Sequence, residues 1–266
     1  MGVTRAARPP FLPATLATHA ALDTSDAGSF DKLVAMARED PGFAVALLRE
    51  ANSVLHRRAR ACLGLREAVT RIGVLGAYEV LVAEPVVRVV LTRTRPAVGH
   101  LVEHSLQVAR GAEFLAQLTE GVEPGVAYAA GLLHDIGHYR HIENATHRLV
   151  DLDAAHWQTP DEVPRVEQEL GHDEHAALGA RDAQSWDLPA ALVYTIRHHH
   201  TPPSRLDPRL QALVQHVRWA DGISIALLRG GQLKLPKARI RSELSLPPPA
   251  QVIPHLVEVM KGTREP

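Results

Sequence analysis

The chain has 266 residues, of which 45% are hydrophobic and 4% aromatic, and its 29 basic and 30 acidic residues give a formal net charge of −1. This length suits one large or two small domains with a substantial core, whereas the balanced charge argues against electrostatic binding of nucleic acid. A single cysteine, Cys62, beside 16 histidines excludes thiolate-based metal or redox chemistry and favours nitrogen and oxygen ligands.

No targeting or membrane segment is expected. No run approaches the roughly 18 apolar residues that a membrane helix needs, and Pro9, Pro10 and Pro13 interrupt the apolar core that a signal peptide requires. One unpaired cysteine suits a reducing compartment. We therefore expect a cytoplasmic protein without a membrane partner, and the sequence leaves its oligomeric state open.

Helical periodicity dominates the chain, with almost no strand-like alternation, which predicts an all-α fold. One helix is expected over residues 29–38 with Ser29 as its cap, and the next over residues 41–52 after Asp40. The apolar stretch at residues 65–90 is interrupted by Gly73, Gly76 and Pro85. We expect it to break into two or three helices and to share an apolar interface with the rest of the chain, because it is too apolar for one small bundle.

Further helices are expected around the candidate site. An apolar-periodic helix begins near His100 and runs to about residue 118, and a second over residues 123–135 opens with Glu-Pro. The polar residues 139–165 are expected to form an insertion over the site. A short terminal helix to about residue 259 follows the three prolines at residues 247–249.

The sequence Pro-Ala-Val-Gly at residues 96–99 predicts a hinge between subdomains. This hinge divides the chain into an N-terminal helical subdomain, residues 1–96, and a metal-binding helical subdomain, residues 97–229. Because two glycines at residues 230–231 end the second subdomain, residues 230–266 are expected to form a C-terminal extension with a short helix.

His134 and Asp135 are neighbours in the apolar segment Ala129–His138. Neighbouring side chains on a helix point about 100° apart, so the two rarely serve one interaction unless a metal ion lies between them. Imidazole nitrogen and carboxylate oxygen are both good ligands for zinc, manganese or iron. Because such a pair is common on protein surfaces, its meaning depends on the other candidate ligands. These are His100, His104, His175, His198, His199, His200 and Asp221.

Several motifs occur in the order found in a known family. They are Leu12-Pro13, Asp40-Pro41 and residues 47–53, 65–73, 103–105, 131–137, 175–180, 186–189 and 199–202. Over roughly residues 10–229 the sequence resembles the HDOD (HD-related output domain) family of the HD metal-dependent phosphohydrolase superfamily. The resemblance implies an HD-type helical domain with an N-terminal helical subdomain packed on it, and a role in bacterial signal transduction.

The resemblance also implies a ligand set for one or two divalent transition metal ions, which would be iron, manganese, nickel or zinc. The minimal set of the superfamily is matched by His104, His134, Asp135 and Asp221. A second metal would be held by His175, His199 and His200, and Asp135 is expected to bridge the two ions. Residues 199–202 match the family's His-His-x-Pro signature, although the three consecutive histidines can also form a pH-sensitive surface cluster. Which two of them are ligands stays open.

Two positions depart from the related HD-GYP phosphodiesterases. His100 lies where those enzymes carry a glutamate that helps to hold an additional metal, so it is a further candidate ligand or a solvent-exposed helix start. His138 replaces a lysine that would contact phosphate, and with Asp135 it is our candidate catalytic residue. The Gly-Tyr-Pro loop is absent after His200, so specific hydrolysis of cyclic di-GMP is unsupported.

The remaining histidines nearby are expected on the surface, namely His141, His147, His156 and His172.

Two classes of function follow from these patterns. The first is a metal-dependent phosphohydrolase or phosphodiesterase that acts on a phosphate-containing small molecule of the nucleotide class. The second is a non-catalytic regulatory module that binds a protein signalling partner or a small ligand, in which the metal site is structural or vestigial. Many members of the resembled family are thought to act in the second way.

Overall fold

The computed structural model describes residues 12–56, 58–83, 95–143, 162–171, 173–228 and 249–262. Throughout these ranges the regular elements are helices and no strand occurs, which confirms the all-α prediction. None of the helices in this part of the chain is long and apolar enough to cross a membrane.

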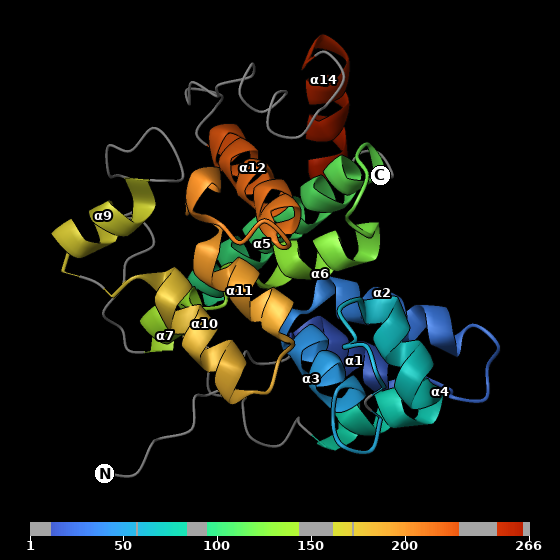
Figure 1. The fold of residues 1–266 in the computed structure, drawn as a ribbon. Coiled ribbons are helices and arrows are strands. Elements are labelled where there is room, and N and C mark those ends of the chain that lie inside the picture. Colours follow the sequence, from blue (N-terminus) through green and yellow to red (C-terminus); the bar gives the residue numbers. More distant parts are fainter. Residues whose placement is uncertain are drawn as a thin grey trace, which may run out of the picture.

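The helices form two groups that pack side by side (Figure 1). The first group contains α1 (Pro13–Ala20), α2 (Ser29–Glu39), α3 (Pro41–Ala51) and α4 (Leu65–Ala83). The second group contains α5 (Arg95–Gln117), α6 (Pro124–Leu133), α7 (His138–Glu143), α9 (Val163–Glu169), α10 (His175–Ser185), α11 (Ala190–His198), α12 (Gln211–Leu228) and α14 (Pro249–Met260). A short 3-10 turn, η4 (Pro203–Arg205), precedes α12.

The starts of the first helices follow local capping chemistry. The Asp40 side chain accepts a hydrogen bond from the Phe43 N–H at 3.0 Å, which confirms the helix expected after Asp40. The prediction that Ser29 caps α2 is wrong. Ser29 is the first residue of the helix, and Gly28 occupies the N-cap position without a side-chain hydrogen bond. Gly73 has a φ of 78° inside α4, which confirms a break there.

Residues 96–99 do not form the expected hinge. They lie in the first turn of α5, which begins at Arg95 and continues without a break to Gln117. Proline is favoured in the first turn of a helix because its missing N–H has no intrahelical partner there, so Pro96 starts the helix instead of interrupting it. The division into residues 1–96 and 97–229 stays a prediction, because residues 84–94 lie outside the described part.

The predicted insertion and terminal extension are described only in part. α7 and α9 occupy the two ends of the polar segment 139–165, while residues 144–161 lie outside the described ranges. The glycine pair at residues 230–231 also lies outside them. The predicted terminal helix is present as α14, which packs against α5.

α5 is the central helix of the second group, with α6, α12 and α14 packed around it (Figure 1). Two glycines allow these close approaches. A Cβ atom at Gly131 of α6 would lie 2.8 Å from the Ala109 Cα of α5, and one at Gly111 would lie 3.1 Å from the Ala220 Cβ of α12. At Gly131 the α5 and α6 backbones therefore approach more closely than any other residue would permit, whereas at Gly111 an added methyl group would contact the neighbouring side chains tightly.

The two groups share one continuous apolar core, which runs from α2, α3 and α4 into α5, α6, α12 and α14, as expected from the apolar stretch after Leu65. A polar contact adds to this interface. Arg38 of α2 donates two hydrogen bonds to the Glu113 carboxylate of α5, at 3.0 and 2.7 Å, and its guanidinium lies 3.6 Å from the Tyr128 ring centroid of α6. The Tyr128 hydroxyl donates to the Arg38 carbonyl at 2.8 Å.

Replacing Gly131 by alanine is predicted to destabilise the fold by about 1–3 kcal/mol, because the added methyl group overlaps the α5 backbone. Chemical denaturation monitored by circular dichroism measures this change. The matched control is Gly99→Ala in α5, where an added Cβ meets nothing within 4 Å and alanine is about 1 kcal/mol more favourable than glycine in a helix. Equal stability of Gly131→Ala and the wild type would contradict the close α5–α6 crossing.

Candidate metal centre

Buried donors from five helices converge on one region of the second group. α5 contributes His104, the end of α6 contributes His134 and Asp135, α10 begins with His175, α11 ends beside His199 and His200, and α12 contributes Asp221. We call these residues the histidine–aspartate cluster. Apart from His104, which is half-buried, all of them are buried.

The turn after α6 brings Asp135 against the first residue of α10. The Glu123 side chain caps the start of α6 by accepting from the N–H groups of Gly125 and Val126, and the helix ends at Leu133 with His134 as its C-cap. Gly137 follows in the turn, and a Cβ there would lie 1.9 Å from the His175 carbonyl oxygen. Only glycine therefore allows α10 to approach this closely.

The Asp135 carboxylate is the centre of the cluster. Its Oδ1 atom lies 3.3 Å from His134 Nε2, 3.1 Å from His175 Nε2 and 3.5 Å from His199 Nε2. Its Oδ2 atom lies 3.4 Å from His104 Nε2. One carboxylate therefore faces imidazole nitrogens on both of its oxygens, which is the arrangement that a bridging ligand requires.

Asp221 lies on the other side of the same histidines. Its Oδ1 atom is 3.3 Å from His104 Nε2 and 3.9 Å from His134 Nε2, and its Oδ2 atom is 3.9 Å from His200 Nδ1. Within the described residues, His134 Nε2, His200 Nδ1 and Asp221 Oδ2 are buried without a hydrogen-bond partner. Such atoms are costly to bury unless they bind another group, such as a metal ion.

Backbone carbonyls orient two of the histidines. The Nδ1–H of His134 donates to the Gly131 carbonyl at 2.7 Å, and the Nδ1–H of His199 donates to the Ile196 carbonyl at 2.8 Å. A carbonyl can only accept, so these contacts assign the proton to Nδ1 and leave the lone pair on the Nε2 atom that faces the cluster.

Side chains orient two further histidines, through residues that the sequence analysis did not identify. His104 Nδ1 lies 3.0 Å from the Ser224 hydroxyl, which itself donates to Gln107 Oε1 at 2.7 Å. His175 Nδ1 lies 2.7 Å from Glu167 Oε1. Ser224 follows Asp221 by three positions and so shares its helix face, a signal available from the sequence. Glu167 lies in a polar segment that carries no such signal.

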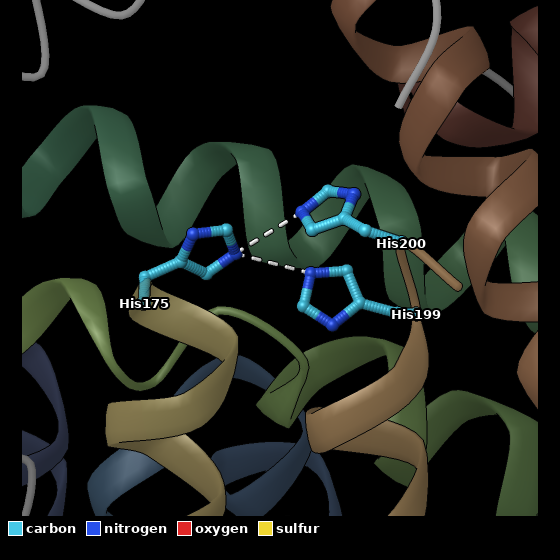
Figure 2. Close-up of side chains that lie close together, drawn as sticks. All are labelled: His175, His199 and His200. Carbon is cyan, nitrogen blue, oxygen red and sulfur yellow. Dashed lines mark hydrogen bonds between the residues drawn. The ribbon is translucent and has the colours of Figure 1, made fainter. Parts of the chain in front are cut away.

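Because their Nδ1 atoms are engaged elsewhere, these histidines direct the lone pairs of their Nε2 atoms toward one another. His175 Nε2 lies 3.1 Å from His199 Nε2 and 3.2 Å from His200 Nε2 (Figure 2). When the Nδ1 atoms of His175 and His199 carry the protons, their Nε2 atoms present only electron pairs to one another and to Asp135. A cation at this point, either a proton or a metal ion, removes the repulsion. The donor set therefore fits the metal that the sequence predicts.

Without a metal, protons on some of the histidines reduce the repulsion between the facing nitrogen lone pairs. Burial opposes a charge on His104, but its hydrogen bonds to Asp135 and Asp221 outweigh burial and raise the pKa of His104 to about 10. For His175, burial is likewise outweighed, by Glu167 and Asp135, so its pKa lies well above the ordinary value. Burial together with neighbouring His199 and His175 holds the pKa of His200 well below it.

Three of the predicted histidines lie differently from the core of the cluster. His100 is exposed at the start of α5, and it belongs to no group of potential metal ligands among the described residues. His198 is directed toward Thr201 Oγ1, at 3.2 Å, and packs on Tyr194. His138 is buried at the edge of the cluster, with Nε2 3.9 Å from the Asp135 carboxylate.

The expectation that His141 lies on the surface is wrong. His141 is 4% exposed, because α7 packs against α10 and turns the face shared by His138 and His141 inward. The other histidines expected on the surface, His147, His156 and His172, lie outside the described residues.

Comparisons with known proteins agree with this architecture. The family model described as HDOD domain matches residues 10–202. A curated but uncharacterised protein of Treponema pallidum is 28% identical over 233 residues, which are 83% of this chain and 44% of that protein. The chain therefore spans less than half the length of this relative.

Solved structures share the fold at low sequence identity. The MmoQ response regulator of Methylococcus capsulatus superposes with a TM-score of 0.72 at 18% identity, covering 96% of this chain and 99% of that one. A virulence factor of Campylobacter jejuni superposes with a TM-score of 0.61 at 15% identity, covering 96% and 95%. These similarities support the arrangement of the helices and carry no information about activity.

Replacing Ser224 by alanine is predicted to lower the affinity of the cluster for a divalent metal about tenfold. The change removes the group that orients His104, and partners of this kind typically contribute 10–100-fold to metal affinity. Competition with a chelator measures the dissociation constant. Ser185→Ala is the control, since the exposed Ser185 lies at the opposite end of α10 from His175 and its hydroxyl donates to the Asp182 carbonyl. Equal affinities in the two variants would contradict the orienting role.

Metal affinity is predicted to keep rising with pH above about pH 7.5. His104, with its pKa raised to about 10, still carries a proton at this pH, and the metal must displace it. The affinity should therefore increase about tenfold per pH unit for each displaced proton between about pH 7.5 and 8.5. Histidines of ordinary pKa would already be neutral, so a pH-independent dissociation constant over this range would contradict the shifted pKa.

Proposed function

Since the chain belongs to the HDOD domain family, we propose that it is a signalling protein whose histidine–aspartate cluster binds divalent transition metal ions and hydrolyses a small phosphate ester. The observation that carries the proposal is the convergence of imidazole Nε2 atoms on Asp135 and Asp221, at separations of 3.1–3.9 Å. Buried donors in this arrangement need a cation, and their types match iron, manganese, nickel or zinc.

The donors divide naturally into two sets that share Asp135. One ion would be held by His104, His134, Asp135 and Asp221. A second would be held by Asp135, His175, His199 and His200. The shared carboxylate supports a site for two ions, since its Oδ2 atom faces His104 of the first set and its Oδ1 atom faces His175 and His199 of the second. His134 of the first set also lies near Oδ1, at 3.3 Å.

A bound pair of such ions activates water and neutralises the oxygens of a phosphoryl group, which is the chemistry of hydrolytic two-metal sites. The chain's own residues would supply the rest. The buried ring of His138, near Asp135, is placed to hold or give a proton. The approach for substrate would be at His104 and Asp135, whose side chains are 11% and 10% exposed, compared with at most 6% for the other cluster members.

The proposed substrate class follows from two proposed cations and from the absence of the lysine and the Gly-Tyr-Pro loop of the HD-GYP enzymes. A phosphate-containing small molecule of the nucleotide class suits a site that presents two cations. Cyclic di-GMP is disfavoured, because His138 replaces the lysine of the HD-GYP motif and Thr-Pro-Pro-Ser follows His200 where those enzymes carry a Gly-Tyr-Pro loop. Small esters such as nitrophenyl phosphates need no such loop and are the expected test substrates.

A regulatory module is the second candidate, and the burial of the cluster favours it. Side chains that are almost completely buried leave little room for substrate to reach the donors, so the ions would then stabilise the fold while a protein partner reads the helical surface. The similarity of the fold to the MmoQ response regulator is compatible with this role. Turnover separates the two candidates.

The proposal is tested by metal content and turnover of the same preparations. Protein purified without added metal is expected to carry one to two ions per chain by elemental analysis. It should hydrolyse nitrophenyl phosphate or bis-nitrophenyl phosphate when manganese or iron is added, and cleave cyclic di-GMP poorly. Asp135→Ala should reduce turnover by at least about 100-fold, because both ion sites lose a shared ligand.

His198→Ala is the matched control, because His198 belongs to the same run of histidines but is directed toward Thr201. It should retain metal and turnover, with circular dichroism confirming that all variants fold. Metal that survives at full stoichiometry in a His134→Ala/Asp135→Ala variant would place the site elsewhere. Full occupancy of the wild type without cleavage of any ester would favour the regulatory module.

A further inference from the structure

We propose that His138, His141 and Glu167 form an additional binding site for a divalent transition metal ion, next to the histidine–aspartate cluster. One donor atom from each residue lies within 4.8 Å of those of the other two. The site goes beyond the proposed function, since neither of the two ion sites described above uses His141 or Glu167 as a ligand.

The three donors come from two elements that flank the start of α10. His138 and His141 are three residues apart on α7 and therefore share one face of the helix, with ring centroids 5.8 Å apart. Glu167 lies on α9, whose Val163 and Val166 pack against Ile225 of α12. Figure 1 shows α7 beside α10, with α9 further out on the same side of the molecule.

Burial separates this group from a chance surface cluster. His138 is 5% exposed, His141 is 4% exposed and Glu167 is fully buried. A buried carboxylate is costly unless it is paired, hydrogen-bonded or bound to a metal. Glu167 accepts from the His175 backbone N–H at 3.2 and 3.3 Å and lies 2.7 Å from its Nδ1. Because a carboxylate has about four lone-pair positions, these contacts leave capacity for a further ligand interaction.

The donor types and distances suit a small transition metal ion. Two imidazoles and one carboxylate form a zinc ligand set that leaves a fourth position open. Donors about 2.1 Å from a tetrahedral ion lie about 3.4 Å apart. From separations within 4.8 Å, side-chain movements of about 1 Å complete the coordination.

His138 and Glu167 also connect this site to the cluster. The His138 ring stacks on the His175 ring with centroids 4.1 Å apart and planes inclined by 14°, and Glu167 orients His175 from its other side. An ion held by these residues would therefore fix His138 and Glu167, the two residues that contact His175 from outside the cluster. The ion would thereby position His175. By binding His138 it would also engage the ring that the proposed hydrolysis uses to hold or give a proton.

The experiment counts ions in the full chain after equilibration with zinc and dialysis against a weak chelator. His141→Ala removes a donor that belongs only to the additional site. His138→Phe keeps an aromatic ring to stack on His175 but removes the nitrogen. Each variant is expected to bind one zinc ion fewer than the wild type. His216→Ala is the matched control, since His216 is a buried histidine of α12 that pairs with Thr119, and it should bind as many ions as the wild type.

A second arm separates this proposal from the proposed function. The His134→Ala/Asp135→Ala variant should lose the ions of the cluster and retain one, and adding His141→Ala should remove that ion. Cobalt absorption spectra provide an independent readout, because the tetrahedral bands of the additional site should disappear in His141→Ala. Equal ion counts in the wild type, His141→Ala and His138→Phe would overturn the additional site alone. A wild type that binds no ion would overturn both proposals.

Discussion

The close packing of α5 against α6 is the constraint on which the histidine–aspartate cluster depends. His104 lies on α5, while His134 and Asp135 follow directly from α6, so the spacing of these donors is set by how near the two backbones come. Gly131 permits this approach, because any side chain there would overlap the α5 backbone. Metal–ligand distances vary by only about 0.2 Å. A shift of α5 against α6 by the width of a methyl group would therefore change the distances from His104 to His134 and Asp135.

The second requirement is orientation, which hydrogen bonds outside the cluster provide. Carbonyls hold His134 and His199, Ser224 holds His104, and Glu167 holds His175. All these contacts engage Nδ1 and turn Nε2 toward the cluster. The same geometry divides the histidines electrostatically. The facing carboxylates raise the pKa of His104 and His175, whereas burial lowers the pKa of His199 and His200.

The N-terminal helices are tied to the two helices that carry the centre. Glu113 of α5 and Tyr128 of α6 both contact Arg38 of α2, and the apolar core is continuous across this contact. A rearrangement of the N-terminal group would therefore act on α5 and α6 directly.

Sequence alone determined the helical class and the break at Gly73, because these depend on local periodicity and backbone chemistry. The motif order of the resembled family placed His134 with side chains of four other helices, and the structure brings these side chains together. Local patterns could not identify Glu167 as a buried partner, show that His141 turns inward, or separate exposed His100 from His104 one turn later. Those outcomes depend on which face of each helix is covered by its neighbours, and only the packing of α7 against α10 and of α5 against α6 and α12 decides this.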